Sequence, residues 1–187
     1  MRAATRLTVG SHRVRLTVVA ADRPGLLADT AAVLAVQGYS VSSASACSWP
    51  TQNLALHTLV FDPGEALNPN RWEELSARLR ILGRKSRAEP AFQPIGPAQV
   101  TVNGTSASDT VVEVSAPDSV GLLWAICRWF ADHDITIASA HACTNYGMAD
   151  NAFIVHGSCD PDALAGYLSP PAEKLSRALP SEVGTTR

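Results

Sequence analysis

A short turn sequence occurs twice in this chain, and this duplication constrains the fold more than any other feature. Residues 20–27 read AADRPGLL, and 96 positions later residues 116–123 read APDSVGLL. An alternating apolar run precedes each copy and a run with helical spacing follows it, so each copy is a strand-to-helix turn. Repetition within one chain indicates two structural units of the same kind.

The similarity between the copies extends beyond the turn. At a spacing of 96, residues 14–47 and 110–143 are identical at 11 of 34 positions. The return strands, residues 56–61 and 150–155, align at a spacing of 94 instead. The hairpin turn before the second return strand is therefore predicted to be two residues shorter.

Each copy predicts the order strand, helix, strand, strand, helix, with a fourth strand to follow. In the first unit we expect strands at residues 13–20, 39–47, 54–61 and 98–102, and helices ending near residue 37 and spanning residues 68–82. In the second unit we expect a last helix at residues 171–179 and no final strand, so the unit lacks its fourth strand or borrows one.

This order predicts an α+β fold of two ferredoxin-like βαββαβ units, each an antiparallel sheet with both helices on one face. The predicted domains are residues 13–104 and 109–182, with residues 1–12 as a disordered N-terminal segment and residues 183–187 as a tail. Two strands carry unusually small side chains, which permit close approach of another layer. We expect the units to pair by sheet edges or faces, with Trp124 as the best candidate for their contact.

The composition narrows the classes of function. Apolar residues make up 46% and charged residues 17%, which suits a packed globular chain. The net charge of −2, without a long run of one sign, argues against a nucleic-acid surface. No apolar stretch approaches the ~20 residues of a membrane span, and the four cysteines lack metal-site spacing, so we expect a cytoplasmic protein with reduced thiols.

The two turns resemble the ACT domain, a small amino-acid-sensing module. The residues that carry this resemblance are DRPGLL at 22–27 and DSVGLL at 118–123, and the tandem covers roughly residues 12–180. Residues 111–118 look most like the paired ACT domains that end the uridylyltransferase acting on the PII protein. The length looks more like stand-alone double-ACT regulators such as the glycine-cleavage repressor.

The turn has the chemistry to hold a zwitterion. A glycine without a Cβ lets a ligand come close, the first helical turn offers unpaired N–H groups to a carboxylate, and an aspartate offers an acceptor to an ammonium group. The resemblance implies contacts from the aspartate, from the backbone at the glycine and the next residue, and from a polar side chain at the start of the second strand. These positions are Asp22, Gly25, Leu26 and Ser40 in the first copy and Asp118, Gly121, Leu122 and Thr136 in the second.

Structural roles are open for the same residues. Asp22 and Asp118 could cap helices, and Gly25 and Gly121 could serve close packing alone. His57 and His156 are expected on the strand surface rather than in catalysis. His141 and Cys143 share a strand face, but the sequence shows no third ligand for a metal.

No sequence motif of an enzyme site is present. We therefore expect a non-catalytic regulatory protein, without a cofactor, that binds an amino acid of the glutamine, serine or glycine type. A homodimer and a regulated protein partner are expected, with no direct contact to nucleic acid or membrane. The alternative is an interaction or dimerisation scaffold with empty sites, or a regulatory partner of a metabolic enzyme or transcription system.

Overall fold

The computed structural model describes residues 4–10, 12–63, 75, 77–78, 89–104 and 109–171. The first half contains the elements β1 (Ala4–Val9), β2 (Val14–Ala20), α1 (Leu26–Val36), β3 (Val41–Trp49), the short 3₁₀ helix η1 (Pro50–Gln52) and β4 (Leu54–Phe61). The second half contains β5 (Gln99–Gly104), β6 (Asp109–Pro117), α3 (Leu122–Asp132), β7 (Thr136–Asn145), β8 (Met148–His156) and α4 (Pro161–Leu168).

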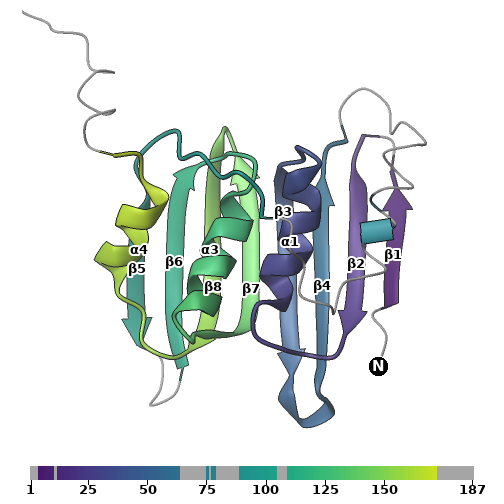
Figure 1. The fold of residues 1–187 in the computed structure, drawn as a ribbon, viewed down its shortest axis with the longest axis horizontal. Helices are drawn as coiled ribbons and strands as arrows, with labels where there is room; N and C mark the ends of the chain where they lie inside the picture. Colours follow the sequence, from purple (N-terminus) through teal and green to yellow (C-terminus); the bar gives the residue numbers. More distant parts are fainter. Residues whose placement is uncertain are drawn as a thin grey trace, which may run out of the picture.

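All eight strands form one antiparallel sheet in the order β1-β2-β4-β3-β7-β8-β6-β5. The helices α1, α3 and α4 lie on the same face of this sheet (Figure 1). Each half repeats the same four-strand order, so the fold is α+β with two ferredoxin-like units, as the sequence predicts.

The halves join edge to edge along β3 and β7, and the helices α1 and α3 lie side by side over the joint (Figure 1). Ser45 faces His141 at the centre of this pairing. On the helix side the strands carry buried alanines, which leave room for two helices to settle close to the sheet: Ala44, Ala46, Ala140 and Ala142. The small-residue strands therefore hold the two units together.

The outer strand of each half comes from a different place than the sequence indicates. β5 pairs with β6, so the prediction that this segment is the fourth strand of the first unit is wrong. The prediction of disorder before residue 13 is also wrong for Ala4–Val9, which pairs with β2 as β1. Each half thus completes its sheet with a hairpin strand before its first core strand. An edge strand is exposed on most of its length. β1 shows little apolar alternation, so its sequence does not indicate a strand.

The helix that follows β8 lies earlier in the chain than the helix predicted at residues 171–179. α4 begins at Pro161, and the Asp160 carboxylate caps it by accepting hydrogen bonds from the N–H groups of Asp162 and Ala163. An aspartate followed by proline is a helix-start signal that the sequence displayed. The predicted helix at residues 171–179 lies outside the described residues, except Pro171. Of the predicted helix at residues 68–82, the described residues 75, 77 and 78 are helical, and Leu75 is buried.

The core lies between the sheet and its helices. Alternate residues of β2 and β4 point into it, including Leu16, Leu59 and Phe61, which are fully buried. The hairpin β7–β8 has a shorter connection than β3–β4, as the spacing of the repeat predicts. Among the described residues, no helix combines the length and apolar character required to cross a bilayer.

Candidate functional site

The two repeated turns have the same backbone geometry. Turn one (residues 22–27) begins α1 and turn two (residues 118–123) begins α3, and in each the helix is preceded by a glycine with positive φ, 73° at Gly25 and 89° at Gly121. Side chains with a Cβ rarely adopt this conformation, which explains the glycine in both copies.

Neither turn has a side-chain cap on its helix. The alternative that Asp22 and Asp118 serve as helix caps is therefore wrong. The N–H groups of Leu26 and Leu122 donate to the carbonyls of Arg23 and Ser119, at 3.2 and 3.1 Å, whereas those of the next two residues of each helix have no intrahelical acceptor. Each turn consequently places free backbone donors next to a carboxylate.

Each turn contacts the opposite half of the molecule. A Cβ built on Gly25 would lie 3.5 Å from Ala131 of α3, and one built on Gly121 would lie 3.9 Å from Ala35 of α1. Small hollows lie at these contacts. The turn-one hollow is lined by Asp22, Gly25 and Leu26 together with Thr136 from the second half, and the turn-two hollow by Asp118, Gly121 and Leu122. Ser40 from the first half reaches Asp118. The structure thus groups the eight predicted residues into two sets, each completed across the joint.

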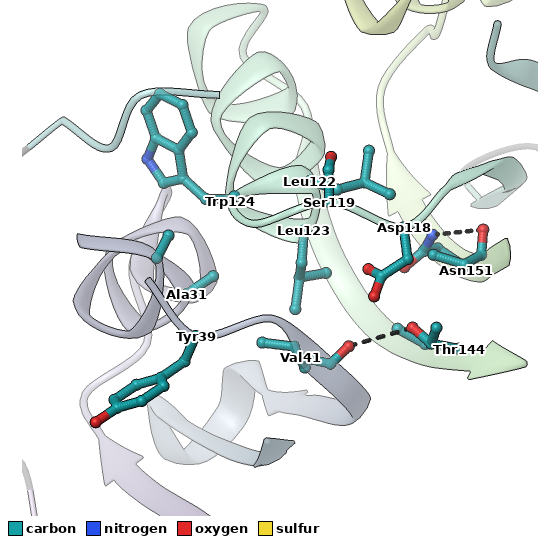
Figure 2. Close-up of a pocket in the computed structure, with 14 residues that line it drawn as sticks. Ala31, Tyr39, Val41, Asp118, Ser119, Leu122, Leu123, Trp124, Thr144 and Asn151 are labelled. Atoms are coloured by element: carbon teal, nitrogen blue, oxygen red, sulfur yellow. Dashed lines mark hydrogen bonds between the residues drawn. The ribbon is translucent and has the colours of Figure 1, made fainter. Parts of the chain in front are cut away.

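The turn-two hollow is largely closed by the protein itself. The Ser40 hydroxyl donates to the Asp118 carboxylate, at 2.8 Å from Oδ2 and 3.0 Å from Oδ1. The enclosed volume is about 20 Å³. Figure 2 shows Asp118, Leu123 and Val41 pointing toward its centre, and Trp124 at its border with Ala31 of α1. Trp124 therefore lies at the contact between the halves, as predicted.

The aspartate of the turn-one hollow lacks the hydrogen bonds that Asp118 accepts at turn two. Within the described residues, no hydrogen bond or ion pair holds the Asp22 carboxylate. The neighbouring Arg23 is paired with Asp29 instead. Thr136, the counterpart of Ser40, is exposed and makes no bond to Asp22. The enclosed volume is about 30 Å³. Since a single water needs about 10–15 Å³, a ligand larger than a few atoms must displace the lining or extend into the mouth.

His57 lines the turn-one hollow, and the expectation that it lies on the strand surface is wrong. Its side chain is 4% exposed, and burial lowers its pKa to about 4, with a further contribution from Arg23. On β4 it lies two residues after Ala55 and two before Leu59, on the same face of the strand. His57 therefore points to the helix side, as they do. That parity is the signal that could have identified it. The equivalent residue in the turn-two hollow is Asn151, whose Nδ2 donates to buried backbone carbonyls.

The hydrogen-bond contacts of His57 favour one tautomer of its ring. The Thr30 hydroxyl donates to the Leu26 carbonyl at 2.9 Å and lies 3.1 Å from His57 Nδ1. A hydroxyl has one hydrogen, so the tautomer that satisfies both contacts is the one in which Nδ1 carries the proton and donates to Thr30 Oγ1. Nε2 is then a hydrogen-bond acceptor. The His57 side chain lines the turn-one hollow.

The remaining candidate residues lie elsewhere. His141 and Cys143 lie on the sheet face opposite the helices, beside a shallow surface depression of about 350 Å³. No cluster of three potential metal ligands occurs among the described residues. His156 is exposed, as predicted, and its Nδ1 lies 2.9 Å from Asp109 Oδ1. All four cysteines are free thiols.

Comparison with known proteins shows sequence similarity to a segment of longer enzymes. No protein-family model matches the chain. The bifunctional uridylyltransferase/uridylyl-removing enzyme of Phenylobacterium zucineum is 31% identical over 160 residues, covering 77% of this chain and 17% of that enzyme. The enzyme of the same name from Gluconobacter oxydans is 33% identical over 154 residues, covering 71% and 16%. The chain therefore spans about one sixth of the length of these relatives.

The fold is also found among solved structures. Aspartate kinase from Synechocystis superposes with a TM-score of 0.53 at 15% identity, over 87% of this chain and 27% of that chain. Sequence similarity thus covers a segment of the uridylyltransferases, and structural similarity covers a segment of a kinase. The structural comparison agrees with a fold of two ferredoxin-like units.

Proposed function

We propose that this chain is a non-catalytic regulatory domain that binds an amino acid at its repeated turns. The observation that supports this most is the turn-one hollow, where a carboxylate without a partner in the described residues lies beside the open first turn of α1. An α-amino acid carries a carboxylate for the helix amides and an ammonium group for Asp22. Thr136 supplies a hydroxyl at the same hollow.

Binding at this place has a route to regulation. The hollow is lined from both halves, by turn one and by the end of α3 with the start of β7. A ligand that fits one arrangement of α1 and α3 better than another shifts the population toward that arrangement. The binding energy is then expressed as a change in how the two halves pack, which a protein partner or a second copy of the chain can sense.

A scaffold without a ligand is the second candidate function. The Ser40–Asp118 hydrogen bonds and the small enclosed volumes favour it, because the protein's own groups already occupy much of the space at the turns. In that case Gly25 and Gly121 serve the close contact between each turn and the opposite helix. The repeated turns then serve the packing of the two halves against each other.

A ligand screen separates these functions. Thermal unfolding in the presence of each of the twenty amino acids at millimolar concentration is expected to show a raised melting temperature for the cognate ligand. The Gly25→Ala variant should lose that response, since the added methyl group enters the hollow toward Ala131. Gly38→Ala is the matched control, with φ of 79° and no neighbour within 4 Å, so it introduces similar backbone strain away from the hollow. A chain that responds to none of the amino acids is a scaffold.

A further inference from the structure

We propose that the open face of the sheet is a dimer interface, on which a second copy of this chain stacks about a two-fold axis parallel to the strands. The open face is the side of the eight strands opposite the helices α1, α3 and α4 (Figure 1). The inference goes beyond amino-acid binding and does not depend on it. It follows from the way in which apolar and charged side chains are arranged on this face.

One row of side chains across the open face is apolar in both halves. Residues directly opposite each other on paired strands share a face of the sheet, so the ladder registers define such rows. From β2 through β4, β3, β7 and β8 to β6, this row consists of Val19, Leu56, Cys47, Ser139, Ile154 and Val111. None of the six is buried, and Ile154 is 40% exposed. A contiguous apolar strip with polar rows beside it is typical of a surface that binds another protein.

The charged side chains beside this row are divided by sign between the two halves. Arg6 of β1 and Arg15 of β2 lie on the open face of the first half, and Glu113 of β6 and Asp150 of β8 on that of the second. All four residues are exposed. Within the described residues none of the four forms an ion pair, and Asp150 accepts a hydrogen bond from the Ser115 hydroxyl. Each half therefore presents charge that the other half can neutralise.

The acidic half is also hollowed. The surface depression of about 350 Å³ is bordered by the carboxylates of Glu113 and Asp150. Ala152 lies at its centre, opposite His141 on one neighbouring strand and Glu113 on the other. A small side chain between two long ones leaves this space. Its size and its carboxylates suit the long cationic side chains of a partner.

A two-fold axis parallel to the strands and above the joint of β3 and β7 matches these features. The sheet order is symmetric about this joint, so the axis places β1 and β2 of one copy over β5 and β6 of the other. Val19 then faces the partner's Val111, and Leu56 faces the partner's Ile154. The two arginines of each copy lie over the acidic depression of the other.

The charges disfavour the other stacked arrangement. A two-fold axis across the strands would place each half over its own copy, so that arginine meets arginine and carboxylate meets carboxylate. The area is sufficient for a stable contact. Eight strands ~4.8 Å apart, each at least six residues long, present a face of roughly 700 Å². This approaches the ~800 Å² that each partner buries in a standard interface.

Sedimentation equilibrium of the full chain at micromolar concentration tests this interface. We expect a dimer that weakens as the salt concentration rises. The double variant Arg6→Glu/Arg15→Glu should raise the dimer dissociation constant about a hundredfold, because both halves then present acid. Arg128→Glu is the control, since this exposed arginine lies on α3, on the helix side of the sheet, and should leave the constant unchanged.

Reversal of both charge sets separates the interface from an effect on folding. The double variant Glu113→Arg/Asp150→Arg should also be monomeric, whereas the chain with all four changes should dimerise again, because acid and base have exchanged places. Circular dichroism verifies that each variant is folded. A monomeric wild type, a dimer that survives Arg6→Glu/Arg15→Glu, or a fourfold variant that stays monomeric would overturn the inference. None of these results bears on the response to amino acids, so the proposed function is tested separately.

Discussion

His57 and Asn151 occupy equivalent places in the two halves, and they show how one residue differentiates a duplicated structure. Both are buried and both line a hollow beneath a repeated turn. The histidine is held by a threonine on α1, whereas the asparagine is held by backbone carbonyls. The imidazole also titrates, so the first half gains a pH dependence that an amide cannot provide.

The depressed pKa of His57 predicts a loss of stability in acid. Its pKa is about 4 in the folded chain and 6.5 as a free side chain, so between these values the unfolded state binds more protons. Stability contributed by neutral His57 is therefore present above pH 6.5 and falls as the pH drops toward 4. The free energy of unfolding should decrease by about 2–3 kcal/mol from this group across that window.

Urea unfolding of wild type and His57→Asn at several pH values measures this contribution. The variant carries the residue found at the equivalent position, and its stability should vary less with pH by the amount given above. Carboxylates contribute to acid unfolding in both proteins and cancel in the difference. Identical pH profiles would show that the imidazole is not buried in its neutral form.

At the scale of elements, α1 and α3 are packed through small side chains over the strand joint. Ala31 and Ala35 of α1 face Trp124 across the turn-two hollow, and Ala131 of α3 faces turn one. The N-terminus of each helix thus lies next to the other helix, and both turns depend on the same helix contact. A change in this contact alters both hollows together.

Enlarging Ala31 should force this contact apart. The residue is 2% exposed, and the adjoining space of about 20 Å³ cannot hold the three extra carbons of leucine. Ala31→Leu is therefore expected to lower the free energy of unfolding by about 1–3 kcal/mol. Ala163→Leu on the exposed side of α4 is the control, and we expect little change there. Denaturant unfolding followed by tryptophan fluorescence gives both values, and equal stability of the two variants would contradict this packing.

At the scale of the whole molecule, the sheet runs without interruption through both halves. β3 bonds to β4 on one side and to β7 on the other, so its backbone groups belong to both units at once. The buried residues of the two halves also form a single core cluster. A half that unfolded alone would expose the small-residue strand and the helix face of its neighbour.

We therefore expect the two halves to unfold together. Far-ultraviolet circular dichroism and tryptophan fluorescence should give coincident urea transitions with one midpoint. Trp49 lies in the first half and Trp124 and Trp129 in the second, so fluorescence reports on both. Two separated transitions would mean that the joint contributes little to stability.

The sequence alone predicted the features that depend on local order. Alternation in β2 and β4, glycine before α1 and α3, and the spacing of the repeat all arise from contacts between near neighbours in the chain. The repeat singled out the aspartate and the glycine of each turn, whereas Ser40 and Thr136 followed from the resemblance to the ACT domain. Their chemistry was readable because a carboxylate, a glycine and a helix start are adjacent in sequence.

Tertiary structure alone decided which distant groups meet. The fold brings Ser40 to Asp118 and His57 to turn one, although these residues are far apart in the sequence. No local sequence pattern encodes such a pairing. For a related reason the sequence missed β1 and assigned β5 to the wrong unit. Exposed edge strands have similar sequences, and only the pairing partner shows where each belongs. The difference between an open and a closed turn therefore arises from the joining of the two halves.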